Sequence, residues 1–202
     1  PAQKGECSII YILPILYTII CYTFHFLFGI FPTNNLKTLS LLLPFIMGIV
    51  NLSVVLIWGR KCSRKILLNC SLIVKYGLIP LYLIGGSSAI GAMLASFFPL
   101  PLMQLSVLVT IVLCIYGYGI LLGAAPYTVA YLARAYKEGV HPKWLVILGG
   151  ICQFLFSFDV LAMMVLTLKE RHKVKTTIAV FCMMCVAVLL DILCVIWQLV
   201  HA

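Results

Sequence analysis

Long apolar runs alternate with short polar segments along the whole chain. The runs extend over residues 8–31, 36–58, 66–98, 103–133, 144–168 and 176–200. A helix rises 1.5 Å per residue, so about 20 apolar residues cross a hydrocarbon core of about 30 Å. Strands of a membrane barrel would instead show about ten residues of alternating polarity. The pattern predicts an all-α, polytopic transmembrane bundle with six spans in a single domain over residues 1–202.

The third run leaves an alternative open. At 33 residues, 66–98 is long for one upright helix, and the small residues 85–88 could form a turn followed by a seventh span. That extra helix would contain Pro99 and Pro101, and each proline removes a helical hydrogen bond. We therefore expect one tilted span here and a loop at the prolines, with seven spans as the alternative.

Lys and Arg residues in the polar segments bear on orientation, because basic residues in short loops are retained in the cytoplasm. Six spans place eight of them on the side of the termini, namely Lys4 and those of 60–65 and 134–143, against five at Lys37 and 169–175. Both termini are then expected to be cytoplasmic in a multi-pass protein of the cell membrane. With seven spans, nine basic residues lie on one side and four on the other. The charge rule therefore favours seven spans, whereas Pro99 and Pro101 favour six.

Composition agrees with a lipid environment. Hydrophobic residues make up 64% of the chain and charged residues 9%, whereas soluble domains carry about a quarter charged residues. The net charge of +9 is explained by basic loops that face anionic headgroups, each basic residue contributing about 1 kcal/mol. Basic stripes interleaved with aromatic residues are missing from the sequence, so nucleic acid is not an expected partner.

Three ionisable residues interrupt the apolar runs: Lys75, Asp159 and Asp191. Such residues face the interior of a bundle and are paired or functional, because a charge at the bilayer centre costs about 2.5 to 3.5 kcal/mol or more. At 1.5 Å per residue, Lys75 and Asp191 both lie about 14 Å from one side of a six-span bundle, and Asp159 lies about 22 Å from it. We therefore predict that Lys75 pairs with Asp191.

Asp159 would then be an unpaired carboxyl group. Burial disfavours its charged form, so it is expected to be protonated at neutral pH or hydrated by a cavity. This expectation suggests proton coupling. The competing interpretation is purely structural, with one ion pair and a protonated Asp159 that donates to a backbone carbonyl.

Weaker polar positions complete the candidate site. A lone intramembrane His or Asn commonly forms a hydrogen bond between helices. The candidate lining residues are Tyr82, Asn51, His25 and Gln153. Small residues describe packing instead: Ser87, Gly91 and Ala95 repeat every four positions, and Gly119 with Gly123 forms a G-x-x-x-G pair, so close helix contacts are expected there.

The sequence lacks the motifs of several common enzyme classes. Zinc-protease, nucleophile-elbow and phosphate-loop motifs do not occur, and we predict neither an enzyme nor a metal or other cofactor. Haem bound between helices would need a second mid-span His besides His25. Cys182 and Cys185 form a C-x-x-C pair, but a membrane thiol oxidoreductase would need a second cysteine pair to exchange electrons with.

Two hypotheses follow. The first is a small solute transporter, proton-linked transporter or solute-binding membrane subunit, with an interior site around Lys75, Asp159 and Asp191. The second is a non-catalytic accessory or assembly protein that contacts a membrane-protein partner through its helices. An interior polar site open to a ligand favours the first, and a dry bundle with all charges paired favours the second.

Overall fold

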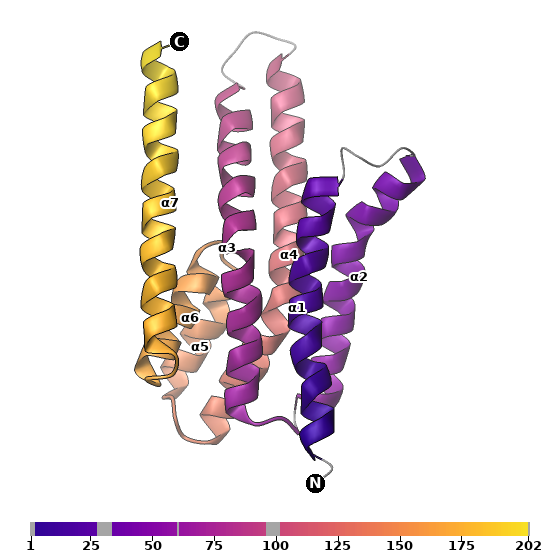
Figure 1. Cartoon of the computed structure of the whole chain (residues 1–202), viewed down its shortest axis with the longest axis vertical. Coiled ribbons are helices and arrows are strands. Elements are labelled where there is room, and N and C mark those ends of the chain that lie inside the picture. Colours follow the sequence, from indigo (N-terminus) through magenta and orange to yellow (C-terminus); the bar gives the residue numbers. More distant parts are fainter. Residues whose placement is uncertain (1–2, 28–33, 60, 96–101, 202) are drawn as a thin grey trace. The chain divides into compact units, whose positions relative to one another are not determined.

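The computed structural model describes residues 3–27, 34–59, 61–95 and 102–201. Every regular element in these ranges is helical, so the prediction of an all-α protein is confirmed for them. The helices are α1 (Gln3–Leu27), α2 (Asn34–Trp58), α3 (Arg64–Ala95), α4 (Leu102–Lys137), α5 (Lys143–Cys152), α6 (Phe158–Lys169) and α7 (Val174–His201) (Figure 1).

Four helices are long and apolar enough to cross a membrane. Their apolar parts are Leu41–Trp58, Arg64–Met93, Met103–Lys137 and Val174–Leu193. The corresponding part of α1 is shorter, at Ile10–Thr23. The count of six spans therefore stays a prediction.

The third apolar run forms a single helix. α3 continues for 32 residues with Pro80 inside it, and residues 85–88 are helical. The turn that seven spans would need at that position is therefore not present. Pro99 and Pro101, which we expected in a loop, lie outside the described residues.

The fifth run differs from expectation. We expected one helix over 144–168, but the chain forms two helices separated by a turn at 153–157. α5 has 10 residues and α6 has 12, so they are about 15 and 18 Å long and neither can cross a 30 Å core. Two glycines near the end of α5, Gly149 and Gly150, weaken its helical preference. In the turn, Ser157 adopts φ 65°, a conformation uncommon for residues other than glycine.

The chain comprises two compact units, which we describe separately. Unit 1 consists of Pro1–Leu78 and Tyr118–Met163, and unit 2 consists of Ile79–Gly117 and Met164–Ala202. Unit 1 therefore holds α1, α2 and α5, the first part of α3 and α6 and the second part of α4.

Glycines let the helices of unit 1 approach closely. A Cβ atom on Gly123 would overlap the hydroxyl of Tyr17 and lie 3.0 Å from the Cα atom of Gly48. A Cβ atom on Gly119 would overlap the ring of Phe45. The G-x-x-x-G pair of α4 is thus a contact face toward α1 and α2, as its spacing predicts.

A proline accounts for a polar contact inside unit 1. Pro14 has no N–H, so the carbonyl oxygen of Ile10, four residues earlier, lacks its helical donor. The Cys70 thiol of α3 lies 3.6 Å from that oxygen and donates to it. Tyr17 and Tyr22 of α1 likewise donate to backbone oxygens of Ile120 and Gly77, at 2.8 and 2.7 Å. These bonds fix α1 against α3 and α4.

Unit 2 has many exposed apolar side chains. Around the middle of α7, large side chains are more than half exposed, as at Leu189 (59%), Leu190 (61%) and Leu193 (60%). A Cβ atom on Gly91 of α3 would meet no neighbouring atom within 4 Å. The small-residue stripe of α3 around Gly91, which we expected to be a close contact face, makes no such contact at this glycine.

Candidate functional site

A fully buried ion pair lies in unit 1. The Lys75 Nζ atom of α3 is 2.6 Å from the Asp159 Oδ2 atom of α6, and both side chains are 0% exposed. Charge-assisted hydrogen bonds of this length are about twice as strong as neutral ones. Desolvating two charges nevertheless costs several kcal/mol per ion, so such a pair is weak support for stability alone.

The pairing corrects the sequence-based prediction. Lys75 pairs with Asp159, so the predicted ion pair with Asp191 and the prediction that Asp159 has no charged partner are both wrong. The depth estimate failed because it treated the fifth run as one straight helix. Asp159 is ten residues from the end of α6 at Lys169, and Lys75 is eleven residues from the start of α3 at Arg64. These separations correspond to about 15 and 16 Å, so the two residues match in depth.

Asp159 lies at the beginning of a helix. It is in the first turn of α6, where a helix carries a partial positive charge. The break in the fifth run creates this helix end. The break therefore places Asp159 at the depth of Lys75.

Two buried acceptors near the break have no hydrogen-bond partner among the described residues. They are the Asp159 Oδ1 atom and the Gln153 Oε1 atom. The amide nitrogen of Gln153 donates to the Gly149 oxygen at 3.2 Å, so only its oxygen lacks a partner. An unsatisfied buried acceptor is a rare feature, typical of a water or ligand position. Both atoms can accept hydrogen bonds from a polar guest.

A second polar cluster of unit 1 links α2 and α4. The Tyr127 hydroxyl donates to Asn51 Oδ1 at 3.0 Å, and Asn51 Nδ2 donates to the Gly123 oxygen at 3.4 Å. Ser71 and Thr128 form a buried side-chain hydrogen bond between α3 and α4. Tyr127 and Thr128 were not candidates from the sequence, because a Tyr or Thr in an apolar run is common and does not show where it points.

Two other predicted site residues belong to unit 2. Asp191 is exposed on α7, and Tyr82 is half-buried on the part of α3 that belongs to unit 2. The side chain of His25 lies outside the described residues.

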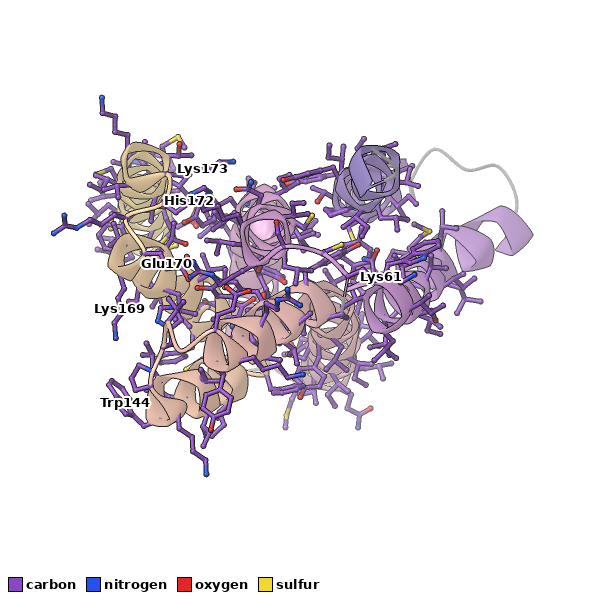
Figure 2. All side chains as sticks on the ribbon, turned by 90° about the horizontal axis from the view of Figure 1, so that it is seen from below. Lys61, Trp144, Lys169, Glu170, His172 and Lys173 are labelled. Carbon is purple, nitrogen blue, oxygen red and sulfur yellow. The ribbon has the colours of Figure 1, made fainter. Side chains whose placement is uncertain are left out.

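One end of unit 1 carries several charged and aromatic residues. Glu138 accepts a hydrogen bond from the Arg134 Nε atom at 2.9 Å. It also forms a salt bridge with Arg64, whose Nε atom lies 3.0 Å from Glu138 Oε2. Figure 2, seen from this end, shows Lys61 after α2 and Trp144 at the start of α5. Trp144 is 63% exposed, and an exposed Trp beside basic residues is typical of a membrane–water interface.

Metal binding has no visible basis in the part of the chain described by the structure. No group of three or more His, Cys, Asp and Glu residues in these ranges is arranged to hold an ion. In the C-x-x-C pair, Cys182 is exposed and Cys185 is half-buried, and neither forms a disulfide.

Comparison with protein-family models, with curated proteins and with solved structures gave no match. The class of the protein therefore rests on its fold and site alone. Apolar helices of spanning length, extensive exposed hydrophobic side chains and interior pairing of charges are compatible with a helical membrane protein.

Proposed function

We propose that this protein is a small membrane transporter or solute-binding membrane subunit whose coupling site is the Lys75–Asp159 ion pair. The observation that carries the proposal is the position of the pair at a helix break, fully buried and with the Asp159 Oδ1 atom still open to a donor. In secondary transporters, interrupted helices commonly form the substrate and ion sites near the bilayer midplane. A purely structural pair would need neither the break nor the open acceptor.

The pair provides a simple means of proton coupling. With Lys75 charged and Asp159 ionised, the site is neutral overall. A proton added to the Asp159 carboxylate leaves the lone ammonium of Lys75 and raises the site charge to +1. An unpaired buried charge is costly. Protonation therefore weakens the attraction between Lys75 on α3 and Asp159 on α6 and allows the site to open. A polar solute that donates to Asp159 and Gln153 would bind the same groups.

Proton flux in liposomes tests this mechanism. The purified protein is reconstituted in liposomes that contain a pH-sensitive dye, and flux is followed after a pH gradient is imposed. We expect Asp159→Asn to abolish proton flux, because the amide cannot release a proton in the physiological range. Asp191→Asn is the matched control, since this carboxyl group is exposed on another helix, and it should retain flux.

A folding failure must be separated from a loss of coupling. Lys75→Met/Asp159→Leu removes both charges, which often leaves stability unchanged or improved. We expect this double variant to fold and to carry no proton flux. A folded Asp159→Asn protein with unchanged flux and pH dependence would exclude the proton-coupled mechanism.

A different observation favours a second candidate function, that of an accessory membrane protein. Asp191 is exposed within an apolar helix whose neighbours Leu190 and Ile192 are 61% and 50% exposed. A carboxyl group that faces hydrocarbon is costly, and a contact with another membrane protein would remove it from lipid. This candidate predicts that Asp191→Leu lowers the assembled mass of the detergent-extracted complex in native mass spectrometry, whereas Asp159→Asn leaves it unchanged.

A further inference from the structure

The turn between α5 and α6 has the composition of a membrane interior, whereas the segments outside the two helices have that of water-exposed loops. Phe154, Leu155, Phe156 and Phe158 are 47%, 48%, 42% and 58% exposed. By contrast, the segments 137–143 and 169–173 contain Lys, Glu, His and Arg. A water-exposed turn is usually polar and rich in Gly, Pro, Asn or Asp, so this turn does not resemble a loop on the far side of a membrane.

The backbone of the turn can tolerate a lipid environment. The N–H groups of Gln153, Phe154 and Leu155 donate to the oxygens of Gly150, Ile151 and Cys152 at 3.0 to 3.2 Å. After the turn, Asp159 N–H donates to the Leu155 oxygen at 3.2 Å. Backbone groups in the bilayer core must find partners within the protein. These bonds supply them through most of the break.

Helix lengths give the depth of the turn. α5 rises about 15 Å from Lys143 and α6 returns about 18 Å to Lys169, each roughly half of a 30 Å core. Figure 1 shows the chain turning back after α5. Asp159 meets Lys75 at a similar distance along α3 from Arg64. Helices of these lengths reach about halfway into a 30 Å core from one surface, and the ion pair matches the depths of Asp159 and Lys75.

We propose that residues 143–169 form a re-entrant hairpin, which enters and leaves the membrane on one side, and that this side faces the anionic headgroups of the cytoplasmic leaflet. α2, α3, α4 and α7 then cross fully, as their 25 to 36 residues allow. α1 is the fifth crossing, with 25 residues that include the shorter apolar stretch Ile10–Thr23. The N-terminus is cytoplasmic and the C-terminus is on the opposite side. The proposal is independent of whether the protein transports a solute.

The distribution of charge follows from this topology. Twelve of the fourteen Lys and Arg residues come to one side: Lys4, Arg60, Lys61, Arg64, Lys65, Arg134, Lys137, Lys143, Lys169, Arg171, Lys173 and Lys175. Lys37 alone lies on the other side, and Lys75 is buried. Six full spans divide the loop residues eight to five and seven spans nine to four. The hairpin therefore satisfies the positive-inside rule better than either count, without a span interrupted by Pro99 and Pro101.

Site-directed labelling tests the hairpin in the full-length protein. Single cysteines replace Glu138, before the hairpin, and His172, after it, and intact membrane vesicles are treated with a membrane-impermeant maleimide. We expect both positions to react from the cytoplasmic side only. The unsubstituted protein measures labelling of the native cysteines, and permeabilised vesicles show that both positions are reactive. Labelling of Glu138→Cys and His172→Cys from opposite sides would overturn the proposal.

A C-terminal epitope tag gives a second, independent result. The re-entrant topology has five crossings, so a protease should remove the tag only from the side opposite Glu138→Cys. Removal from the same side would require an even number of crossings and would contradict the topology.

Lipid retention tests the headgroup partner. The purified protein is exposed to equal amounts of phosphatidylglycerol and phosphatidylcholine and analysed by native mass spectrometry. We expect several-fold more phosphatidylglycerol to remain bound and Arg171→Gln/Lys173→Gln/Lys175→Gln to reduce this preference, whereas the control Lys37→Gln leaves it unchanged. Equal retention of the two lipids by the wild-type protein would overturn the assignment of anionic headgroups.

Discussion

Lys75 and Asp159 lie 84 positions apart in the sequence, yet their charged atoms are 2.6 Å apart in the interior of unit 1. The pair joins a long, continuous helix to a short one that begins at a break. Since both residues are fully buried, each charge depends on the other for compensation. The contact therefore bears directly on the stability of the site.

Removal of one member of the pair should be much more harmful than removal of both. We expect Lys75→Met to lower the free energy of unfolding by about 3 to 5 kcal/mol, because it leaves a buried carboxylate uncompensated. Lys75→Met/Asp159→Leu should recover most of this loss. Unfolding in mixed micelles with increasing SDS measures both effects. Lys61→Met, at an exposed position, is the control, and equal destabilisation by the single and double variants would contradict the coupling.

The helix boundaries show which parts of the fold are predictable from sequence. The second run, 36–58, corresponds closely to α2. A basic segment ends this run, and a group of charged residues is too costly to place in hydrocarbon. The fifth run, 144–168, contains no proline or charged loop, and apolar composition alone does not reveal a break. Its signals were weaker: Gly149 and Gly150 are followed within nine residues by the polar residues Gln153, Ser157 and Asp159.

Four of the seven predicted site residues are buried in unit 1, but their pairing was not predictable. Lys75, Asp159, Asn51 and Gln153 were selected because lipid disfavours polar groups, and all four are buried. The partner of Lys75 was wrong because depth along a run is meaningful only for an unbroken helix. Tyr127 could not be selected in advance, since a Tyr in an apolar run can be a packing residue as well as a donor.

The hydrogen bond from Tyr127 to Asn51 should contribute measurably to stability. Tyr127→Phe removes the hydroxyl and leaves the Asn51 Oδ1 atom buried without this donor, which costs about 1 to 3 kcal/mol. Tyr136→Phe is the matched control, because Tyr136 is 49% exposed and its change should be within about 0.5 kcal/mol. Unfolding midpoints in SDS titrations would show the difference. A similar small effect for both variants would mean that the Tyr127 bond adds little.

Two glycines should respond in opposite ways to the same substitution. Gly123→Ala places a methyl group against the Tyr17 hydroxyl and the Gly48 backbone, and we expect a loss of about 1 to 3 kcal/mol from overpacking. Gly91→Ala meets no atom within 4 Å and should be neutral or stabilising by up to about 1 kcal/mol, because alanine favours the helix. Thermal aggregation of the detergent-solubilised variants compares them directly. Destabilisation by Gly91→Ala would indicate that this face is covered by a neighbour in the membrane.

Ser157 provides a test of the helix break itself. Its φ of 65° costs a residue with a Cβ atom about 1 to 2 kcal/mol, whereas glycine adopts this conformation freely. Glycine also gains about 0.5 to 1 kcal/mol of conformational freedom in the unfolded chain, so Ser157→Gly should stabilise the protein by less than about 1 kcal/mol. Ser157→Val should destabilise it, because branching at Cβ makes a positive φ a genuine outlier.

Ser87→Gly is the control, since Ser87 lies within α3, where glycine in place of serine weakens the helix. The variants are compared by their unfolding midpoints in SDS titrations. If Ser157→Val were more stable than Ser157→Gly, the turn would not adopt this backbone conformation. Asp159 would then reach Lys75 in another way.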